Sequence, residues 1–148
     1  MKNVFILLVL LFGVFQAKEY KAVFDCSSSD AQYIKTRMWL IDKTMTMIEK
    51  RGDKATFAIT LHGSCVPMIS KEFDFIVPDK DLADIQKAHD YLKDLATKRG
   101  VKVIACAMSL ASNAINRKDV VEFVKISDNS FIDTIGFQND GYALMTFK

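Results

Sequence analysis

Cys106 is the residue of this sequence whose position best suits chemistry, because it stands between a predicted strand and a predicted helix. Residues 101–105 form a short apolar run, which is typical of a strand buried on both faces. Residues 109–114 suit the start of a helix. In an open α/β sheet, chemistry collects just beyond the carboxyl ends of the strands, where amide donors and a helix dipole favour the reactive thiolate. A small buried hydrophobic residue is the alternative interpretation of this cysteine.

A second polar loop is expected beside that cysteine. His62, Ser64 and Cys65 follow the predicted strand 54–61, and a glycine and a proline in the same stretch indicate a loop. The carboxyl ends of parallel strands meet at one edge of a sheet. The sequence therefore predicts a thiol site in which Cys106 is the nucleophile, with His62, Ser64 or Cys65 in support.

The remaining cysteine, Cys26, follows the predicted strand 20–25 and leaves two alternatives open. Cys26 and Cys65 can form a structural disulfide, or both can be unpaired bystanders. His62 likewise has a structural interpretation, in which it only bonds to the backbone of its loop. With three cysteines in the chain, at least one thiol stays free unless two chains pair through it.

Several classes of function are disfavoured by what the sequence lacks. Its six glycines are scattered, and none forms a phosphate-binding loop or a nucleophile elbow. His62-x-x-Cys65 supplies at most two metal ligands locally, so we expect no metal and no cofactor. The formal charge is only +2, and both signs are interspersed along the chain. Nucleic acid is therefore not an expected partner.

The N-terminal residues 1–17 have the layout of a secretory signal peptide. Lys2 is followed by an apolar stretch, and Ala17 precedes an abrupt polar run. The apolar stretch is shorter than the roughly 20 residues of a membrane-spanning helix, which favours cleavage over anchoring. Residues 18–148 have the size of one domain, and no later segment is apolar for long enough to cross a membrane.

Predicted strands and helices alternate along residues 18–148, which indicates a mostly parallel sheet with helices on both faces. The helix stripe of Ile34, Met38 and Ile41 has the spacing of one buried face. Residues 68–79 are ambiguous and are interpreted as a short edge or covering segment. The expected strands are 20–25, 54–61, 101–105, 120–126 and 142–147, and the expected helices are 30–51, 79–98, 109–114 and 131–137.

Four segments together resemble the DsrE/DsrF-like proteins, particularly their small single-domain YchN-like branch. They are the first strand with its long helix, LHGSCVP at 61–67, VKVIACAMSL at 101–110 and GYALMTF at 141–147. The resemblance covers nearly all of residues 20–148. It implies a three-layer α/β/α fold with a five-stranded, mainly parallel sheet, and assembly into homotrimers or homohexamers.

The resemblance also implies a chemistry, because relatives of this kind relay sulfur as a persulfide on a cysteine that follows a strand. Cys106 occupies the matching position, whereas Cys65 replaces what is usually a small residue and inherits no role. The expectation is a sulfur carrier that works with donor and acceptor proteins in the periplasm of a Gram-negative bacterium. Whether it is an enzyme in its own right stays open.

Two other functions remain as alternatives to the carrier. One is a non-catalytic oligomeric module that binds a small ligand or an anion between subunits. The other is a thiol oxidoreductase that pairs Cys106 with Cys65 or Cys26, although the sequence has no C-x-x-C pair. Burial and reactivity of the Cys106 sulfur distinguish these possibilities.

Overall fold

A computed structural model describes residues 16–147 of the chain. All but the last two residues of the predicted signal segment therefore lie outside the described residues. The described part contains one five-stranded sheet in which every neighbouring pair is parallel, in the order β4-β3-β2-β1-β5. The strands are β1 (Glu19–Cys26), β2 (Lys54–Leu61), β3 (Lys102–Cys106), β4 (Lys125–Ser127) and β5 (Ala143–Phe147). The predicted five-stranded α/β architecture is confirmed.

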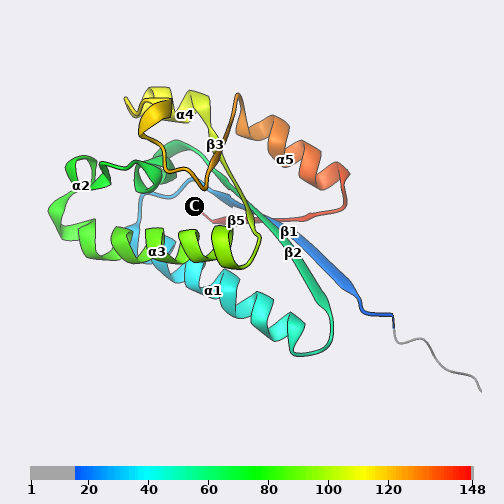
Figure 1. Ribbon diagram of the computed structural model, residues 1–148. Helices are drawn as coiled ribbons and strands as arrows, with labels where there is room; N and C mark the ends of the chain where they lie inside the picture. Colours follow the sequence, from blue (N-terminus) through cyan, green and yellow to red (C-terminus); the bar gives the residue numbers. More distant parts are fainter. Residues whose placement is uncertain (1–15, 148) are drawn as a thin grey trace, which may run out of the picture.

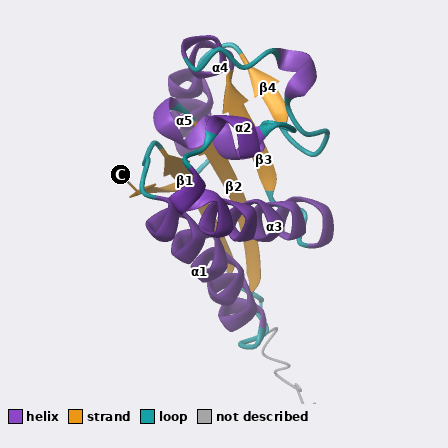
Figure 2. Cartoon of the chain, turned by 90° about the vertical axis from the view of Figure 1, so that its left-hand side faces the viewer, coloured by secondary structure: helices purple, strands orange, loops and turns teal. Residues whose placement is uncertain are grey.

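Helices cover both faces of the sheet, so the molecule has three layers (Figure 1). The long helices α1 (Ala31–Glu49) and α3 (Leu82–Lys98) lie side by side on one face, called here the α1/α3 face. Figure 2 shows these two helices against the strands from another direction. The shorter α5 (Ser130–Asn139) covers the opposite face, called the α5 face. The short α4 (Ala107–Ser112) follows β3 directly.

Most of the hydrophobic core lies between the sheet and the pair α1 and α3. Helix α1 begins where Asp30 accepts a hydrogen bond from the backbone N–H of Tyr33 at 2.8 Å, which satisfies an otherwise unpaired donor of the first turn. Its predicted stripe is buried at spacings of four and three residues, and α3 contributes a matching stripe. The buried residues of the two helices are Ala31, Ile34, Met38, Ile41, Met45, Ile48, Ile85, Ala88, Leu92 and Leu95.

Side chains of the strands alternate between the two faces, and this alternation positions the site. Phe24 of β1 packs edge to face on Phe57 of β2 on the α1/α3 face, with 5.2 Å between the ring centroids. Val23 and Ala58 point to the α5 face, where they pack with Tyr142. Every second residue along β1 counted from Val23, and along β2 counted from Ala58, therefore points toward α5.

Two expectations for the connecting segments differ from the structure. Residues 68–79 form helical turns, namely the end of η1 (Gly63–Ile69), α2 (Phe73–Ile76) and the start of η2 (Asp79–Asp81). Of the two interpretations of this segment, the edge strand is wrong, whereas a covering segment agrees with the packing of Phe73 and Val77 against the core. The expected strand 120–126 is also wrong over residues 120–124, because β4 begins only at Lys125.

Residues just before β4 pair with the η1 region instead of the sheet. Ser70 and Val120 form an isolated antiparallel bridge, and the N–H of Val121 donates to the carbonyl of Ile69 at 3.0 Å. Val120, Val121 and Val124 are buried through this contact and belong to the core. These apolar residues have strand propensity, but their pairing partner is the η1 region and not the sheet.

Candidate functional site

Cys106 is the last residue of β3 and leads directly into α4, as the sequence predicts. All three cysteines of the chain are described, and Cys106 is the one outside a disulfide. Only 4% of the residue is exposed to solvent in the single chain. The structure therefore places a free thiol at the carboxyl edge of the sheet, just beneath the surface.

Two serines surround the sulfur of Cys106 with hydrogen-bond donors. Burial by itself raises the pKa of the Cys106 thiol, because it disfavours the charged form. Ser130 and Ser109 each direct a backbone N–H and a hydroxyl toward the sulfur, and these hydrogen bonds favour the thiolate. Their combined effect outweighs burial, so the pKa lies below the ordinary thiol value of 9.0. A nucleophilic thiolate is stabilised at this position.

The loop that follows β2 is tied to the same serine. The N–H of Gly63 donates to Oγ of Ser109 at 2.9 Å, and the side-chain amide of Asn113 donates to the carbonyl of Gly63 at 3.1 Å. Gly63 has a φ of +53°, a left-handed conformation that glycine adopts without a steric penalty. The loop and α4 thus fix the Ser109 hydroxyl, which remains able to donate toward the Cys106 sulfur.

His62 belongs to a second hydrogen-bonded group on the α5 face. Its Nε2 lies 3.1 Å from Oδ2 of Asp25, and the other carboxylate oxygen of Asp25 accepts a hydrogen bond from the Thr60 hydroxyl at 2.7 Å. The ring of His62 also contacts Phe131 edge to face, at 6.4 Å between centroids. The side chains of His62 and Asp25 are only about one fifth exposed, at 20% and 21%. A partly buried carboxylate therefore orients the imidazole.

The strand register brings these groups into one row. Leu61 pairs with Ala105, so the next positions along the two strands are His62 and Cys106. Cys106 in turn pairs with Ser127 of β4, whose hydroxyl is hydrogen-bonded to Asp133 of α5. We call this arrangement the polar row. It crosses the α5 face at the carboxyl edge and consists of Asp25, Thr60, His62, Cys106, Ser127 and Asp133.

The structure answers the question that the sequence left open about the other cysteines. Cys26 and Cys65 form a disulfide, with 5.9 Å between their Cα atoms. Both belong to the core cluster that includes the stripes of α1 and α3, whereas Cys106 faces Ser130 of α5. Cys65 is thus held on the other side of the sheet from Cys106, and as a disulfide partner it offers no thiol.

Ser64, the remaining candidate for a supporting role, is exposed and lines a cavity that neither His62 nor Cys106 borders. That cavity has a volume of about 380 Å³ and lies among η1, the beginning of α1 and the residues before α3. Ser29, Lys80 and Asn113 also line it. The structure therefore brings His62 into register with Cys106, and it places Ser64 and Cys65 elsewhere.

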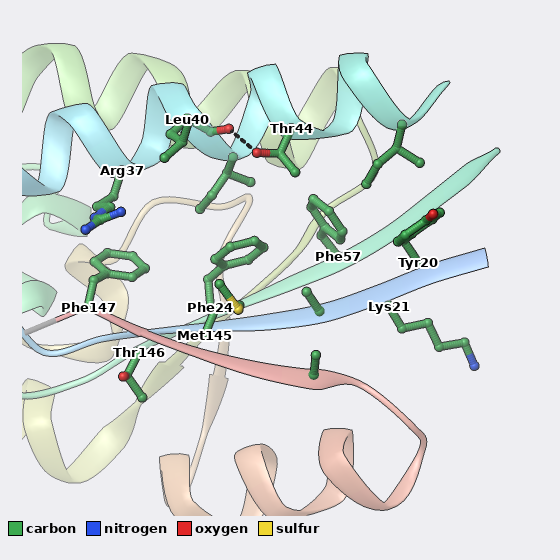
Figure 3. Close-up of a pocket in the computed structure, with 14 residues that line it drawn as sticks. Tyr20, Lys21, Phe24, Arg37, Leu40, Thr44, Phe57, Met145, Thr146 and Phe147 are labelled. Carbon is green, nitrogen blue, oxygen red and sulfur yellow. Dashed lines mark hydrogen bonds between the residues drawn. The ribbon is translucent and has the colours of Figure 1, made fainter. Parts of the chain in front are cut away.

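A larger cavity of about 500 Å³ lies on the α1/α3 face, as an apolar groove between α1 and strands β1 and β5 (Figure 3). Leu40 and Thr44 border it from α1, and Phe24 and Met145 border it from the sheet. Arg37 is a charged side chain at one end. The sheet separates this groove from the polar row, so it is a feature distinct from the Cys106 site.

Within residues 16–147, no group of three or more His, Cys, Asp or Glu side chains is arranged to hold a metal ion. Among the helices of that same range, none is long and apolar enough to cross a membrane.

Of the residues at this site, sequence reasoning singled out only His62 and Cys106. It missed the other members of the polar row and the two serine donors, namely Asp25, Thr60, Ser127, Asp133, Ser109 and Ser130. Asp25 was included only as the end of the first strand, although a carboxylate at that position is unusual in an interior strand and marks the same edge as His62. Ser130 stands directly before the expected helix 131–137 and was given no role at the thiol site. Nothing in the local sequence indicated that the first turn of α5 reaches the end of β3.

Comparisons with known proteins agree with this fold. An uncharacterized protein of Aquifex aeolicus (strain VF5) is 34% identical over 147 residues, which cover 99% of this chain. The chain spans 64% of the length of that relative. The solved structure of MTH1491, a protein of unknown function from Methanobacterium thermoautotrophicum, has a TM-score of 0.67 at 15% identity. The match covers 86% of this chain and 99% of that one, and at this identity it shows the shared fold alone. A sequence profile described as the DsrE/DsrF-like family matches residues 21–147, and the chain therefore belongs to that family.

Proposed function

We propose that this protein is a sulfur carrier that holds persulfide sulfur on Cys106 and passes it from a donor protein to an acceptor protein. Membership of the DsrE/DsrF-like family suggests a sulfur-relay-type role. The observation that supports Cys106 as the carrier residue is the set of N–H and hydroxyl donors from Ser109 and Ser130 around its sulfur. A thiolate is the reactive form in thiol exchange, and these donors stabilise it.

The transfer needs no oxidant and no reductant. The Cys106 thiolate attacks the outer sulfur of a donor persulfide and forms a new S–S bond with it. The S–S bond of the donor breaks, and the donor thiolate leaves with the electron pair of that bond. Delivery to the acceptor repeats the step, with the acceptor thiolate as the attacking group and Cys106 as the leaving group. The same donors stabilise the Cys106 thiolate when it leaves.

The proposal includes export to the periplasm of a Gram-negative bacterium. Two observations support it: residues 1–17 have the pattern of a signal peptide, and Cys26 and Cys65 form a disulfide. Disulfides persist mainly in oxidising compartments. Export predicts that the protein isolated from a periplasmic fraction lacks residues 1–17, which its intact mass reveals. Full-length protein confined to the cytoplasmic fraction would contradict it.

The proposal also includes assembly into a homotrimer or homohexamer, as expected for this family. Large apolar side chains exposed on α5 support it, since Phe131, Ile132 and Ile135 are 68%, 69% and 58% exposed in the single chain. Contiguous exposed apolar residues mark interaction surfaces. Light scattering on the purified protein measures the assembly directly, and a monomer at micromolar concentration would contradict it.

One alternative function has an observation in its favour. Cys106 is almost fully covered, which also fits a non-catalytic module that binds a small ligand or an anion between subunits. Such a module needs no reactive sulfur. The two functions differ in whether the native thiol reacts at all.

Intact mass spectrometry after incubation with a persulfide donor distinguishes them. A carrier gains the mass of one sulfur atom, loses it on reduction, and gains nothing in Cys106→Ser. The matched control is the double variant Cys26→Ala with Cys65→Ala, which keeps Cys106 and is expected to load sulfur normally. A native Cys106 that neither accepts sulfur nor reacts with an alkylating reagent would contradict the carrier and favour the binding module.

A further inference from the structure

We infer that His62, oriented by Asp25, accepts the proton of the Cys106 thiol and returns it at the end of each sulfur transfer. This inference deepens the proposed function and rests on it for the transfer step. Its first part, proton acceptance from the thiol, can be tested without any sulfur donor.

The first supporting observation is the register of β2 and β3. His62 and Cys106 occupy the positions directly after the pair Leu61 and Ala105, and His62 keeps an extended backbone with φ −147° and ψ 177°. Neighbouring strands lie roughly 4.8 Å apart. Two side chains that leave the same face at matched positions are within reach of each other, directly or through one water molecule.

The second observation is that both side chains meet the same helical turn. His62 contacts the ring of Phe131, and Cys106 is hydrogen-bonded by Ser130, the residue before it. Two consecutive residues at the start of α5 thus bracket the pair. This arrangement agrees with the strand register, which places the imidazole and the sulfur on the same face of the sheet.

The third observation is the Asp25 carboxylate. Its Oδ2 lies 3.1 Å from Nε2 of His62, and its Oδ1 is held by the hydroxyl of Thr60, a residue with no exposed surface. A carboxylate that accepts a hydrogen bond from Nε2–H leaves the lone pair on Nδ1, the other ring nitrogen. The hydrogen bond thereby fixes the ring so that Nδ1 is the nitrogen able to take up a proton. Asp25 is therefore a positioning residue that acts through His62.

The proton of the Cys106 thiol is fully accounted for in this step. The Sγ–H bond of Cys106 breaks, the proton moves to His62, and the electron pair stays on sulfur as the thiolate. After the thiolate has attacked the donor persulfide, the imidazolium gives the proton to the donor thiolate that leaves. His62 returns to its neutral form, and no other reagent is consumed.

The elements around this pair carry few ionisable side chains that could affect it. β1 contributes Asp25, β3 contributes Lys102 toward its start, β4 contributes Lys125, and α5 contributes Asp133 through Ser127. α4 contributes no ionisable side chain. Within this set, Asp25 is the group in contact with His62.

The experiment is a pH titration of the thiolate absorbance, with Cys106→Ser subtracted as the blank. The disulfide stays intact, so the signal reports Cys106 alone. His62→Gln keeps a side chain that can bond to Asp25 but cannot take up a proton. It is expected to move the thiolate midpoint to higher pH and to reduce the thiolate present at pH 7 about tenfold, the change given by one pKa unit. Circular dichroism verifies that each variant is folded.

Asp25→Asn is a second, independent test, because the direction in which it shifts the thiolate midpoint distinguishes two roles for Asp25. If Asp25 were only a nearby negative charge, its removal would favour the thiolate and move the midpoint to lower pH. If it acts through the imidazole, its removal moves the midpoint to higher pH. The matched control is His89→Gln, since the other histidine of the chain lies on α3 and bonds to the Met68 carbonyl at 2.9 Å. No shift is expected there.

Sulfur loading, measured by intact mass on the same samples, separates the two proposals. A midpoint shift with no loading of the wild type supports the proton acceptor and overturns the carrier. Loading of the wild type with unshifted midpoints in His62→Gln and Asp25→Asn overturns the proton acceptor and leaves the carrier. A shift to lower pH in Asp25→Asn also overturns the role assigned to the pair. If His62→Gln does not fold, the sign of the Asp25→Asn shift decides.

Discussion

The two faces of the sheet differ in what their residues do. On the α1/α3 face, two long helices bury a continuous apolar core, and the Cys26–Cys65 disulfide lies within it. On the α5 face, one shorter helix packs on a small apolar cluster around Val23 and Tyr142. The carboxyl edge of that second face carries the polar row.

This difference separates stability from reactivity. Burial of apolar surface is the dominant stabilising contribution in folding, and most of that surface is on the α1/α3 face. The α5 face can therefore hold a partly buried carboxylate, an imidazole and a thiol at some energetic cost. We expect substitutions on the first face to change the free energy of unfolding, and substitutions in the polar row to change the ionisation of Cys106.

The largest expected loss of stability comes from Leu92→Ala on α3. Leu92 has no exposed surface, so its truncation leaves a cavity and should lower the free energy of unfolding by about 2–5 kcal/mol. The thiolate midpoint of Cys106 should not change. Chemical denaturation and the thiolate titration measure the two quantities. If Leu92→Ala kept the free energy of unfolding but shifted the thiolate midpoint of Cys106, the α1/α3 face would not be the face that provides stability.

Removal of the disulfide, by Cys26→Ala together with Cys65→Ala, should have the next largest effect. The bridge joins residues separated by 39 positions and so restricts the unfolded chain. We expect the free energy of unfolding to fall by about 2–4 kcal/mol, the usual range for a native bridge. Reductant should destabilise the wild type similarly and leave the double variant unaffected. Equal stability of the two proteins under oxidising conditions would contradict a structural role.

Ser130→Ala should act on the thiol more than on the fold. It removes one hydroxyl donor, keeps the backbone N–H and leaves Asn129 as the residue that caps α5, so the pKa of Cys106 should rise. Because the pKa of the folded protein lies below that of a free thiol, the ionised sulfur stabilises the fold above about pH 9. That contribution is lost as the pH falls through the lowered pKa. In Ser130→Ala the ionised sulfur should therefore stabilise the fold less than in the wild type.

The control for this prediction is Ser112→Ala on α4. The Ser112 hydroxyl donates to the carbonyl of Met108 and is not among the donors to Cys106. Denaturation at several pH values and the thiolate titration compare the two serines. Equal effects of the two substitutions would show that the Ser130 hydroxyl has no special role at the sulfur.

The smallest effect is expected for Ile132→Ala on the outer side of α5. The side chain is 69% exposed, and substitutions at such positions change stability by about 0.5 kcal/mol or less. This is the counterpart of Leu92→Ala, since both truncate a large apolar side chain of a helix. A loss above about 1 kcal/mol that depends on protein concentration would show that this surface is covered in an assembly.

The sequence predicted the fold well because its periodic patterns are long. The α1 stripe from Ile34 to Ile48 and the apolar strand before Cys106 each specify an element and its buried side. The segment 120–126 was predicted less well, because Val120 and Val121 have strand propensity but bond to the η1 region. Local propensity does not determine which partner a segment pairs with.

The site was predictable only in part, for a related reason. Cys106 and His62 each follow a predicted strand, so their common edge follows from the order of elements. Ser130 reaches the sulfur through the packing of α5, which follows β4 in the chain and lies on the same face of the sheet as Cys106. The Cys26–Cys65 pairing likewise depends on where η1 folds back, which residue spacing alone does not determine.

The place of β5 in the sheet has a consequence for how the protein is made. Strand β1 lies between β2 and β5, so the first strand of the described fold pairs with the last. During synthesis, β1 therefore has one open edge until β5 leaves the ribosome, and long-range parallel pairing of this kind forms slowly. The sheet therefore stays incomplete in the nascent chain until the last strand is available. A chaperone that covers unpaired strand edges is the kind of factor whose depletion should lower the yield of this protein.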